Sequence, residues 1–243
     1  MPRIYVHGLP TGVEGYVLQI VNGQPVFAGI NSSIILHEDW LTNATGKLNW
    51  TIGTSGTATV ATGLTVADNT HPGILELRTP TGTASAFLGG AATATAGFIL
   101  GNGTLIYEWL IRLEDLATAG ENYNLLVGLS DTAGATLNNI RFTYLGNGAP
   151  TWLAVTTASA ISTTTTTSVP VLADTWIKLK TVVNPLATSC DFYIDNVLVA
   201  NHSTNISLSV MAPRIRLLKT VGTTSRAVYV DYFALNQQLV VPR

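Results

Sequence analysis

The most informative stretch of the sequence is CDFYIDNVLVA, residues 190–200. Aromatic and aliphatic residues fill its first half, and aliphatic residues return directly after Asp195-Asn196. Both turn residues tolerate a positive φ, so they favour a two-residue connection between antiparallel strands. The segment therefore predicts a β-hairpin made of residues 191–194 and 197–200.

The sequence on either side of this hairpin has the same character. Runs rich in Val, Ile, Thr, Tyr and Trp alternate with clusters of Gly, Asn and Pro. No window has a long apolar period of three to four residues, so we expect very little helix. Many short strands at this spacing predict an all-β sandwich or barrel. The predicted strands are residues 16–20, 24–28, 73–78, 104–113, 123–130, 139–145, 151–156, 176–183, 190–194, 197–202, 214–219 and 227–235.

Period-two alternation predicts which faces of these strands are buried. Leu105, Tyr107, Trp109, Ile111 and Leu113 share one face of their strand. The strand 226–235 is apolar on both faces, which predicts a central position between two layers. In that strand the alternation groups Tyr229, Asp231, Phe233 and Leu235 on one face, opposite Val228, Val230 and Tyr232.

The composition excludes several classes of protein. Of 243 residues, 47% are hydrophobic and 11% are charged, and the formal net charge is −2. Such a chain is too apolar for a disordered protein. It also lacks the excess of basic residues that is typical of a nucleic-acid binder. Because Cys190 is its single cysteine, it has no disulfide framework. Soluble domains carry about 25% charged residues, so much of this surface must be neutral. Neutral groups cost less to desolvate than charges, which favours assembly, although an ordinary Thr-rich β domain has the same composition.

Neither a membrane span nor a signal peptide is expected. The longest uncharged stretches, residues 79–107 and 142–173, are broken by Gly, Pro, Asn and Thr. Residues 1–15 have no apolar core of the secretory type. We therefore expect the chain to fold in a cytoplasm.

Two parts are predicted, with a boundary after residue 36. Asn22-Gly23 is a strong hairpin signal, so residues 1–36 should contain one hairpin, which cannot be stable alone. We interpret residues 1–36 as an attachment or oligomerisation arm and residues 37–243 as the main β domain. The Thr-rich stretch 158–168 is either a strand or a loop.

Several segments of the main part resemble the concanavalin A-like jelly roll, which includes the laminin G-like modules. The similar segments are DTWIKLKTVV (174–183), CDFYIDNVLVA (190–200), NYNLLVGLSD (122–131) and VYVDYFAL (228–235). The resemblance extends over residues 38–239 and implies a jelly-roll sandwich. It says little about function, because this fold serves lectins, glycanases and scaffolds.

Residues 8–27 resemble a short element of phage tail and fibre proteins, with Phe27 at the usual Trp position. That resemblance implies a tailed-bacteriophage virion protein. It also implies that attachment or oligomerisation is carried by Tyr16, Leu18, Ile20, Asn22, Gly23, Pro25 and Phe27.

The chemistry of an enzyme is not expected. The paired carboxylates of jelly-roll glucanases need a Glu-x-Asp-x-x-Glu strand, whereas the nearest cluster here is Glu108, Glu114 and Asp115. No Gly-x-Ser-x-Gly elbow or phosphate loop occurs. The histidines are interpreted as surface residues. No cofactor or metal is expected; Asp131, Asp191 and Asp195 could bind Ca²⁺ but also suit turns and strand edges.

A glycan site would use an exposed aromatic ring framed by polar donors. The candidates are Trp152, Tyr144, Tyr123 and Arg141, because Trp152 follows a Gly/Pro-rich turn. Core packing is the alternative for each aromatic residue, and Trp40, Trp109 and Trp176 are assigned to the core.

These observations lead to a non-enzymatic virion protein, either a capsid decoration (cement) protein or a short head fibre. We expect a homotrimer on the virion surface, assembled in the host cytoplasm, with the major capsid or tail proteins as partners and no nucleic acid. The alternative is a receptor-binding tail fibre or lectin-like module that recognises host surface glycan. A glycan-cleaving enzyme is a third possibility.

Overall fold

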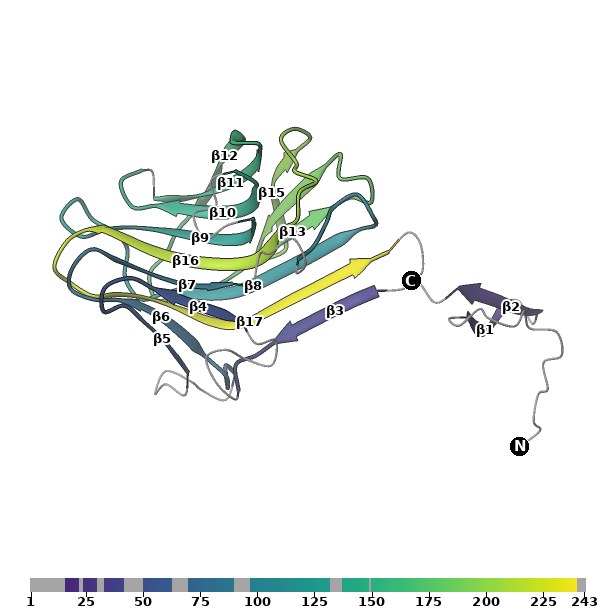
Figure 1. Ribbon diagram of the computed structural model, residues 1–243, viewed down its shortest axis with the longest axis horizontal. Helices are drawn as coiled ribbons and strands as arrows, with labels where there is room; N and C mark the ends of the chain where they lie inside the picture. Colours follow the sequence, from purple (N-terminus) through teal and green to yellow (C-terminus); the bar gives the residue numbers. More distant parts are fainter. Residues whose placement is uncertain are drawn as a thin grey trace.

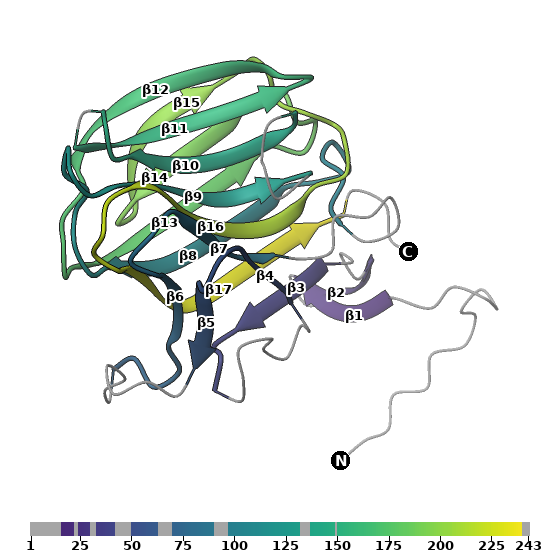
Figure 2. The ribbon, with the colours of Figure 1, turned by 60° about the vertical axis from the view of Figure 1, so that its left-hand side comes forward.

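The computed structural model describes residues 16–21, 24–29, 33–41, 50–62, 70–89, 97–131, 137–148 and 150–239, and its strands form two large antiparallel sheets packed face to face (Figure 1). The seven-stranded sheet runs β12 (Ile161–Pro170), β11 (Thr151–Ala158), β10 (Asn139–Leu145), β9 (Asn122–Ser130), β16 (Ala212–Val221), β7 (Ala84–Gly89) and β4 (Thr51–Thr54). The eight-stranded sheet runs β15 (Val197–His202), β14 (Cys190–Ile194), β13 (Trp176–Val183), β8 (Leu105–Leu113), β17 (Arg226–Gln238), β6 (Leu75–Thr79) and β5 (Thr59–Thr62). Its eighth strand, β3 (Ser33–Glu38), pairs with the second half of β17, whereas β6 pairs with the first half (Figure 2). The predicted all-β sandwich is confirmed.

A third, two-stranded sheet is formed by β1 (Tyr16–Val21) and β2 (Gln24–Gly29). Val21 is paired with Gln24, as a two-residue connection requires, and the turn residues Asn22 and Gly23 lie outside the described residues. Figure 1 shows this hairpin apart from the sandwich, beyond the start of β3. The expected boundary after residue 36 falls inside β3, which belongs to the eight-stranded sheet.

The core between the sheets contains an aromatic cluster centred on Trp109 of β8. The rings of Trp40, Trp50 and Phe233 surround it, with centroids 6.4, 5.7 and 4.5 Å from that of Trp109. The predicted alternation of β8 is confirmed, since every second residue from Leu105 to Leu113 is buried. Tyr107 also links the two sheets, because its hydroxyl donates to the carbonyl oxygen of Ile140 at 2.7 Å.

β17 is an interior strand of its sheet, but the predicted position between two layers is wrong, because only one of its faces packs against the other sheet. The register against β8 shifts between Val230 and Tyr232, so Asp231 forms a β-bulge. An extra residue reverses the alternation beyond it. Val228 and Val230 therefore join Phe233 and Leu235 in the same core. Tyr229 instead packs with Ile74 and Ala227 in a separate cluster on the outer face.

The Thr-rich segment is a strand, β12, at the edge of the seven-stranded sheet. Its alternate threonines face the interior and form hydrogen bonds that close the side of the sandwich. Thr165 contacts Nε2 of His202 at 3.0 Å, and Thr167 donates to the carbonyl oxygen of Trp152 at 2.8 Å. His202 is consequently buried, which corrects the expectation that it lies at the surface. Burial lowers the pKa of this imidazole.

The predicted β-hairpin made of residues 191–194 and 197–200 is confirmed. Asp195 and Asn196 have φ values of 48° and 66°, and they connect β14 to β15. Cys190 at the start of β14 is buried, which raises the pKa of its thiol well above the ordinary value. Among the described residues, no helix is long and apolar enough to cross a membrane.

Candidate functional site

Three of the four residues predicted to bind glycan are inside the sandwich. Trp152, Tyr144 and Tyr123 are each at most 2% exposed, and their rings pack against one another in the core. The hydroxyl of Tyr123 donates to the carbonyl oxygen of Asp115, and that of Tyr144 accepts from the amide of Ala117. These rings cannot stack on a sugar, so the prediction of an aromatic platform is wrong for them. The register of β9, β10 and β11 directs these side chains toward the core, and this outweighs the exposure that the neighbouring Gly/Pro-rich turn would favour for Trp152.

Arg141, the fourth predicted residue, lies on the outer face of the seven-stranded sheet. Its Cα is paired with that of Gly128 on β9, and Gly128 is paired on its other side with Arg214 of β16. Arg216 lies two residues further along β16, opposite Leu126. Side chains two residues apart on a strand share a face, so the three arginines gather around one position. They line a hollow together with Leu126, Gly128 and Ser130, which we call the arginine hollow.

Two glycines make room for these side chains. A Cβ at Gly128 would lie 2.2 Å from the carbonyl oxygen of Ile140 and 2.8 Å from the Cβ of Arg141. A Cβ at Gly89 would lie 2.8 Å from the Cγ of Arg214. The Arg214 stem therefore lies across Gly89, with its guanidinium 5.9 Å from the centre of the Phe87 ring. The floor of the hollow at Gly128 is backbone.

The guanidiniums in this hollow are partly removed from water. Arg214 is 9% exposed, and Arg141 and Arg216 are half-buried. Burial lowers the pKa of Arg141 to about 10 and also lowers the pKa of Arg214 and Arg216. The negative charge of Asp131 acts in the opposite direction on Arg214. Charge interactions between groups with this little contact with water are stronger than they would be in bulk water.

Sequence reasoning missed Arg214 and Arg216, although their spacing carried a usable signal. The pattern Arg214-Ile215-Arg216 within a predicted strand places both arginines on the same face, opposite buried Ile215. The pattern could not show which strand lies beside β16, because β16 pairs with β9, which is more than eighty residues away in the sequence.

The outer face of the eight-stranded sheet carries a different cluster. Arg112 lies 4.8 Å from the centre of the Tyr229 ring and 5.3 Å from that of Trp176, and it forms an ion pair with Asp174. His71 stacks on Trp176 at 4.5 Å. Trp176 is thus half-buried outside the sandwich, which corrects its assignment to the core. Cation–π contacts and the ion pair already use these groups within the protein.

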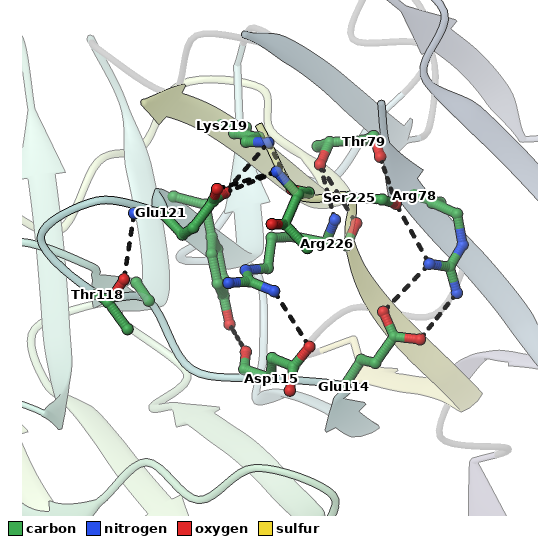
Figure 3. A network of polar contacts seen from close by, with 12 residues as sticks. Arg78, Thr79, Glu114, Asp115, Thr118, Glu121, Lys219, Ser225 and Arg226 are labelled. Carbon is green, nitrogen blue, oxygen red and sulfur yellow. Dashed lines mark hydrogen bonds and ion pairs between the residues drawn. The ribbon is translucent and has the colours of Figure 1, made fainter. Parts of the chain in front are cut away.

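A polar network ties the loops together at the end of the sandwich where β6 ends and β17 begins (Figure 3). The Arg78 guanidinium bonds to both carboxylate oxygens of Glu76 and to both of Glu114, at 2.8 to 3.1 Å. Arg78 therefore lies between these two carboxylates and bonds to both. The network fastens the β6, β8 and β17 segments to one another.

The same network contains a buried ammonium group. Lys219 Nζ donates to the carbonyl oxygens of Pro80, Thr81 and Thr224 and lies 3.4 Å from a Glu121 carboxylate oxygen. The Glu121 carboxylate accepts the backbone N–H groups of Thr223 and Thr224, which lowers its pKa to about 2.

The three aspartates considered for calcium have structural partners instead. Asp131 accepts from the Asn138 amide, Asp191 from the Asn201 amide, and Asp195 from the backbone N–H of Lys178. Within the part of the chain that the structure describes, no three His, Cys, Asp or Glu side chains gather in a way that could hold a metal ion.

The fold and the arginine hollow define a jelly-roll β-sandwich with a cationic hollow on one outer face. The family model described as "SO2946-like, C-terminal domain" matches residues 70–231, more than half of the chain. The chain belongs to this SO2946-like family. No curated protein matches the sequence.

Solved structures agree on the fold. SO2946 from Shewanella oneidensis MR-1, a protein of unknown function, has a TM-score of 0.62 at 9% identity, over 100% of this chain and 98% of that chain. The β-glucanase of Bacillus licheniformis gives 0.54 at 12% identity, over 83% and 97%. The binding domain of botulinum neurotoxin DC in complex with SialylT gives 0.50 at 8% identity, over 94% and 49%. At these identities the likeness concerns the fold alone, and it confirms the predicted jelly-roll sandwich.

Proposed function

We propose that this chain is a non-enzymatic structural protein of a bacteriophage virion, a capsid decoration protein or short head fibre. In this proposal residues 1–36 attach the chain to the particle or join its copies. Residues 37–243 form the displayed sandwich, whose location is the virion surface after assembly in the host cytoplasm. The partners are two further copies in a homotrimer and the major capsid or tail proteins.

The observation that carries the proposal is the separation of the β1–β2 hairpin from the sandwich. Its two strands pair with each other and, among the described strands, with no others. A two-stranded sheet is at best marginally stable in water, so it gains most from contact with another surface. The resemblance of residues 8–27 to phage fibre elements supports a virion as the place of that contact.

The surface beside β3 supports association as well. Ile35 is 69% exposed on β3, and it lines a largely apolar hollow with Ile106, Ala234 and Leu235 on the eight-stranded sheet. Ile35 belongs to β3, the strand that follows β2 in the chain. An exposed apolar surface of this kind is typical of an interaction site.

The proposal is tested by light scattering on the full chain and on residues 33–243. Starting at residue 33 keeps all of β3, so the eight-stranded sheet stays complete, and circular dichroism with thermal melting checks that the sandwich is intact. We expect a trimeric mass for the full chain and a monomeric mass for the shorter one. Equal masses for the two proteins would contradict an assembly role for the N-terminal residues.

A second candidate function is a receptor-binding module that recognises host surface glycan. The arginine hollow favours it, because it offers charged donors on an outer sheet face. A structural neighbour, the neurotoxin binding domain, has been seen in complex with SialylT. Binding is also favoured over glycan cleavage, although two neighbours are a β-glucanase and a glycosidic hydrolase. In this chain Arg78 separates the carboxylates of Glu76 and Glu114.

A further inference from the structure

We propose that the end of the sandwich where β3 begins is the surface that receives the β1–β2 hairpin of a second copy of this chain. We call it the neutral end, and its described loop residues are 97–104, 131, 137–138, 159–161, 184–189 and 203–211. The inference rests on the proposed function and deepens it, because it gives the N-terminal hairpin a partner and a place to bind.

The loops of the neutral end are bonded to one another, so they form one continuous surface. The loop before β8 lies against the β13–β14 loop, because the amide of Gly103 donates to the carbonyl oxygen of Pro185 at 3.2 Å. It also lies against the loop before β16, where Phe98 and Met211 exchange backbone hydrogen bonds of 2.7 and 3.0 Å. Further hydrogen bonds extend the surface to the loops of the seven-stranded sheet; they join Ser207 to Asn138, Asn138 to Ser159 and Leu137 to Ala160.

Large apolar side chains are exposed on this surface. Leu186 is 71% exposed and Leu208 is 61% exposed, although leucine is usually buried. Among the described residues, six of the eleven exposed large apolar side chains lie at the neutral end or on β3 beside it, and they are Ile35, Ile99, Leu137, Ile161, Leu186 and Leu208. Single exposed apolar residues need no explanation, but a group of them on one surface is typical of an interaction site.

The neutral end also carries almost no charge. Among its described residues Asp131 is the one charged side chain, and its carboxylate already accepts a hydrogen bond from the Asn138 amide at 2.8 Å. The opposite end carries the charged network of Figure 3, which contains Arg78, Glu114, Asp115, Glu121, Lys219 and Arg226. The centres of protein interfaces are depleted of charged residues, because charges are costly to remove from water. The neutral end is therefore the end suited to contact with another protein surface.

The β1–β2 hairpin is an occupant of matching chemistry. Its residues 16–29 include no charged residue, and eight of the fourteen are hydrophobic. An isolated two-stranded sheet is at best marginally stable in water, so the hairpin gains from being covered. Contact between two uncharged surfaces buries apolar area without the cost of desolvating charges.

A second copy, rather than the same chain, supplies the hairpin. β2 ends at Gly29 and β3 begins at Ser33, and four residue steps reach about 14 Å at most, so the hairpin leaves the sandwich beside the neutral end. Figure 1 shows it apart from its own sandwich, beyond the start of β3. Its strands pair with no other described strand. In that position the hairpin of one copy is available to the neutral end of the next.

The first measurement co-expresses two full-length variants, Gln19→Cys and Leu208→Cys, and treats the product with a bismaleimide cross-linker. Each chain then has one reactive cysteine, because the native Cys190 is buried, so every cross-link joins two copies. We expect mass spectrometry to find a cross-link between positions 19 and 208. Leu172→Cys, at an exposed leucine of the opposite end, replaces Leu208→Cys as the control and should give no cross-link to position 19.

The second measurement is light scattering on the full-length variants Leu186→Asp, Leu208→Asp and Leu172→Asp. A charge on the neutral end should weaken association, so we expect the first two to raise the concentration needed for half-association at least tenfold. Leu172→Asp should associate like the parent protein. All three positions are exposed, and circular dichroism checks that each sandwich is folded.

Absence of the cross-link between positions 19 and 208, or neutral-end aspartate variants that associate as strongly as the parent, would overturn this proposal. A hairpin that covers its own neutral end would give no cross-link between copies and would overturn it too. In either case a trimeric full chain with monomeric residues 33–243 would leave the assembly role of the N-terminal residues standing. Equal masses for those two proteins would instead contradict the proposed function itself.

Discussion

Replacing Lys219 with methionine tests the reasoning about the buried polar network most directly. The side chain of Lys219 has 0% exposure, and its ammonium group contacts three carbonyl oxygens and the Glu121 carboxylate (Figure 3). Methionine has a similar length and volume, so Lys219→Met removes the charge and the donors while leaving only a small change in packing.

The expected loss follows from the groups that remain. Removing one partner of a buried charged cluster costs about 3–5 kcal/mol, since the other members stay buried without it. Glu121 keeps the N–H groups of Thr223 and Thr224, so its carboxylate is still solvated by the protein. We therefore expect the lower end of the range, about 3 kcal/mol in the free energy of unfolding. For a domain of this size that corresponds to a fall in melting temperature of about 6–12 °C.

The assay is urea unfolding followed by tryptophan fluorescence, with thermal melting by circular dichroism as a second measurement. Lys178→Met is the matched control, because Lys178 lies half-buried on β13 and its backbone N–H, rather than its ammonium, bonds to Asp195. The control should change the melting temperature by less than about 2 °C, since surface substitutions usually cost under 0.5 kcal/mol. A Lys219→Met protein as stable as the control would refute the view that this ammonium holds the three loops together.

Two further predictions follow from burial and hydrogen bonding. Trp152→Ala should destabilise the fold by about 3–5 kcal/mol in urea unfolding, because the ring is fully buried; a stable variant would contradict its place in the core. The Glu121 pKa is lowered to about 2, so this carboxylate should stabilise the protein at neutral pH and lose that contribution as the pH falls from about 4.5 to 2. Melting temperatures of the parent protein and Glu121→Gln should converge over that interval, and a difference that persists at pH 2 would show that another group is responsible.

The sequence predicted those strands in which large apolar side chains alternate with other residues, because this alternation marks the face of the strand that is buried. β8 and β13 have the expected bounds to within one residue, because each alternates large apolar side chains with others. It did not predict β7, whose ASAFLG sequence contains small residues that pack against the opposite sheet without an alternation of size. It left β12 undecided, since threonine suits both a strand and a loop, and the partners that decide between them, His202 and Thr204, are distant in sequence.

The errors at the candidate site have one physical origin, the register between strands. Trp152 follows a Gly/Pro turn, which favours exposure locally, but the pairing of β11 with β10 turns its ring to the core. The same kind of pairing brings Arg141 and Arg214 to either side of Gly128, although they are far apart in the chain. Alternation within a strand indicates which side chains share a face. Only the pairing of strands determines which of those side chains meet.

The two proposed roles use opposite faces of the sandwich, which allows one chain to perform both. β3 and the apolar hollow at Ile35 belong to the eight-stranded sheet. The arginine hollow belongs to the outer face of the seven-stranded sheet, on the other side of the core. If copies associate or attach through β3 and the hairpin, the arginines face away from the contact. Attachment would then present the outer face of the seven-stranded sheet away from the contact.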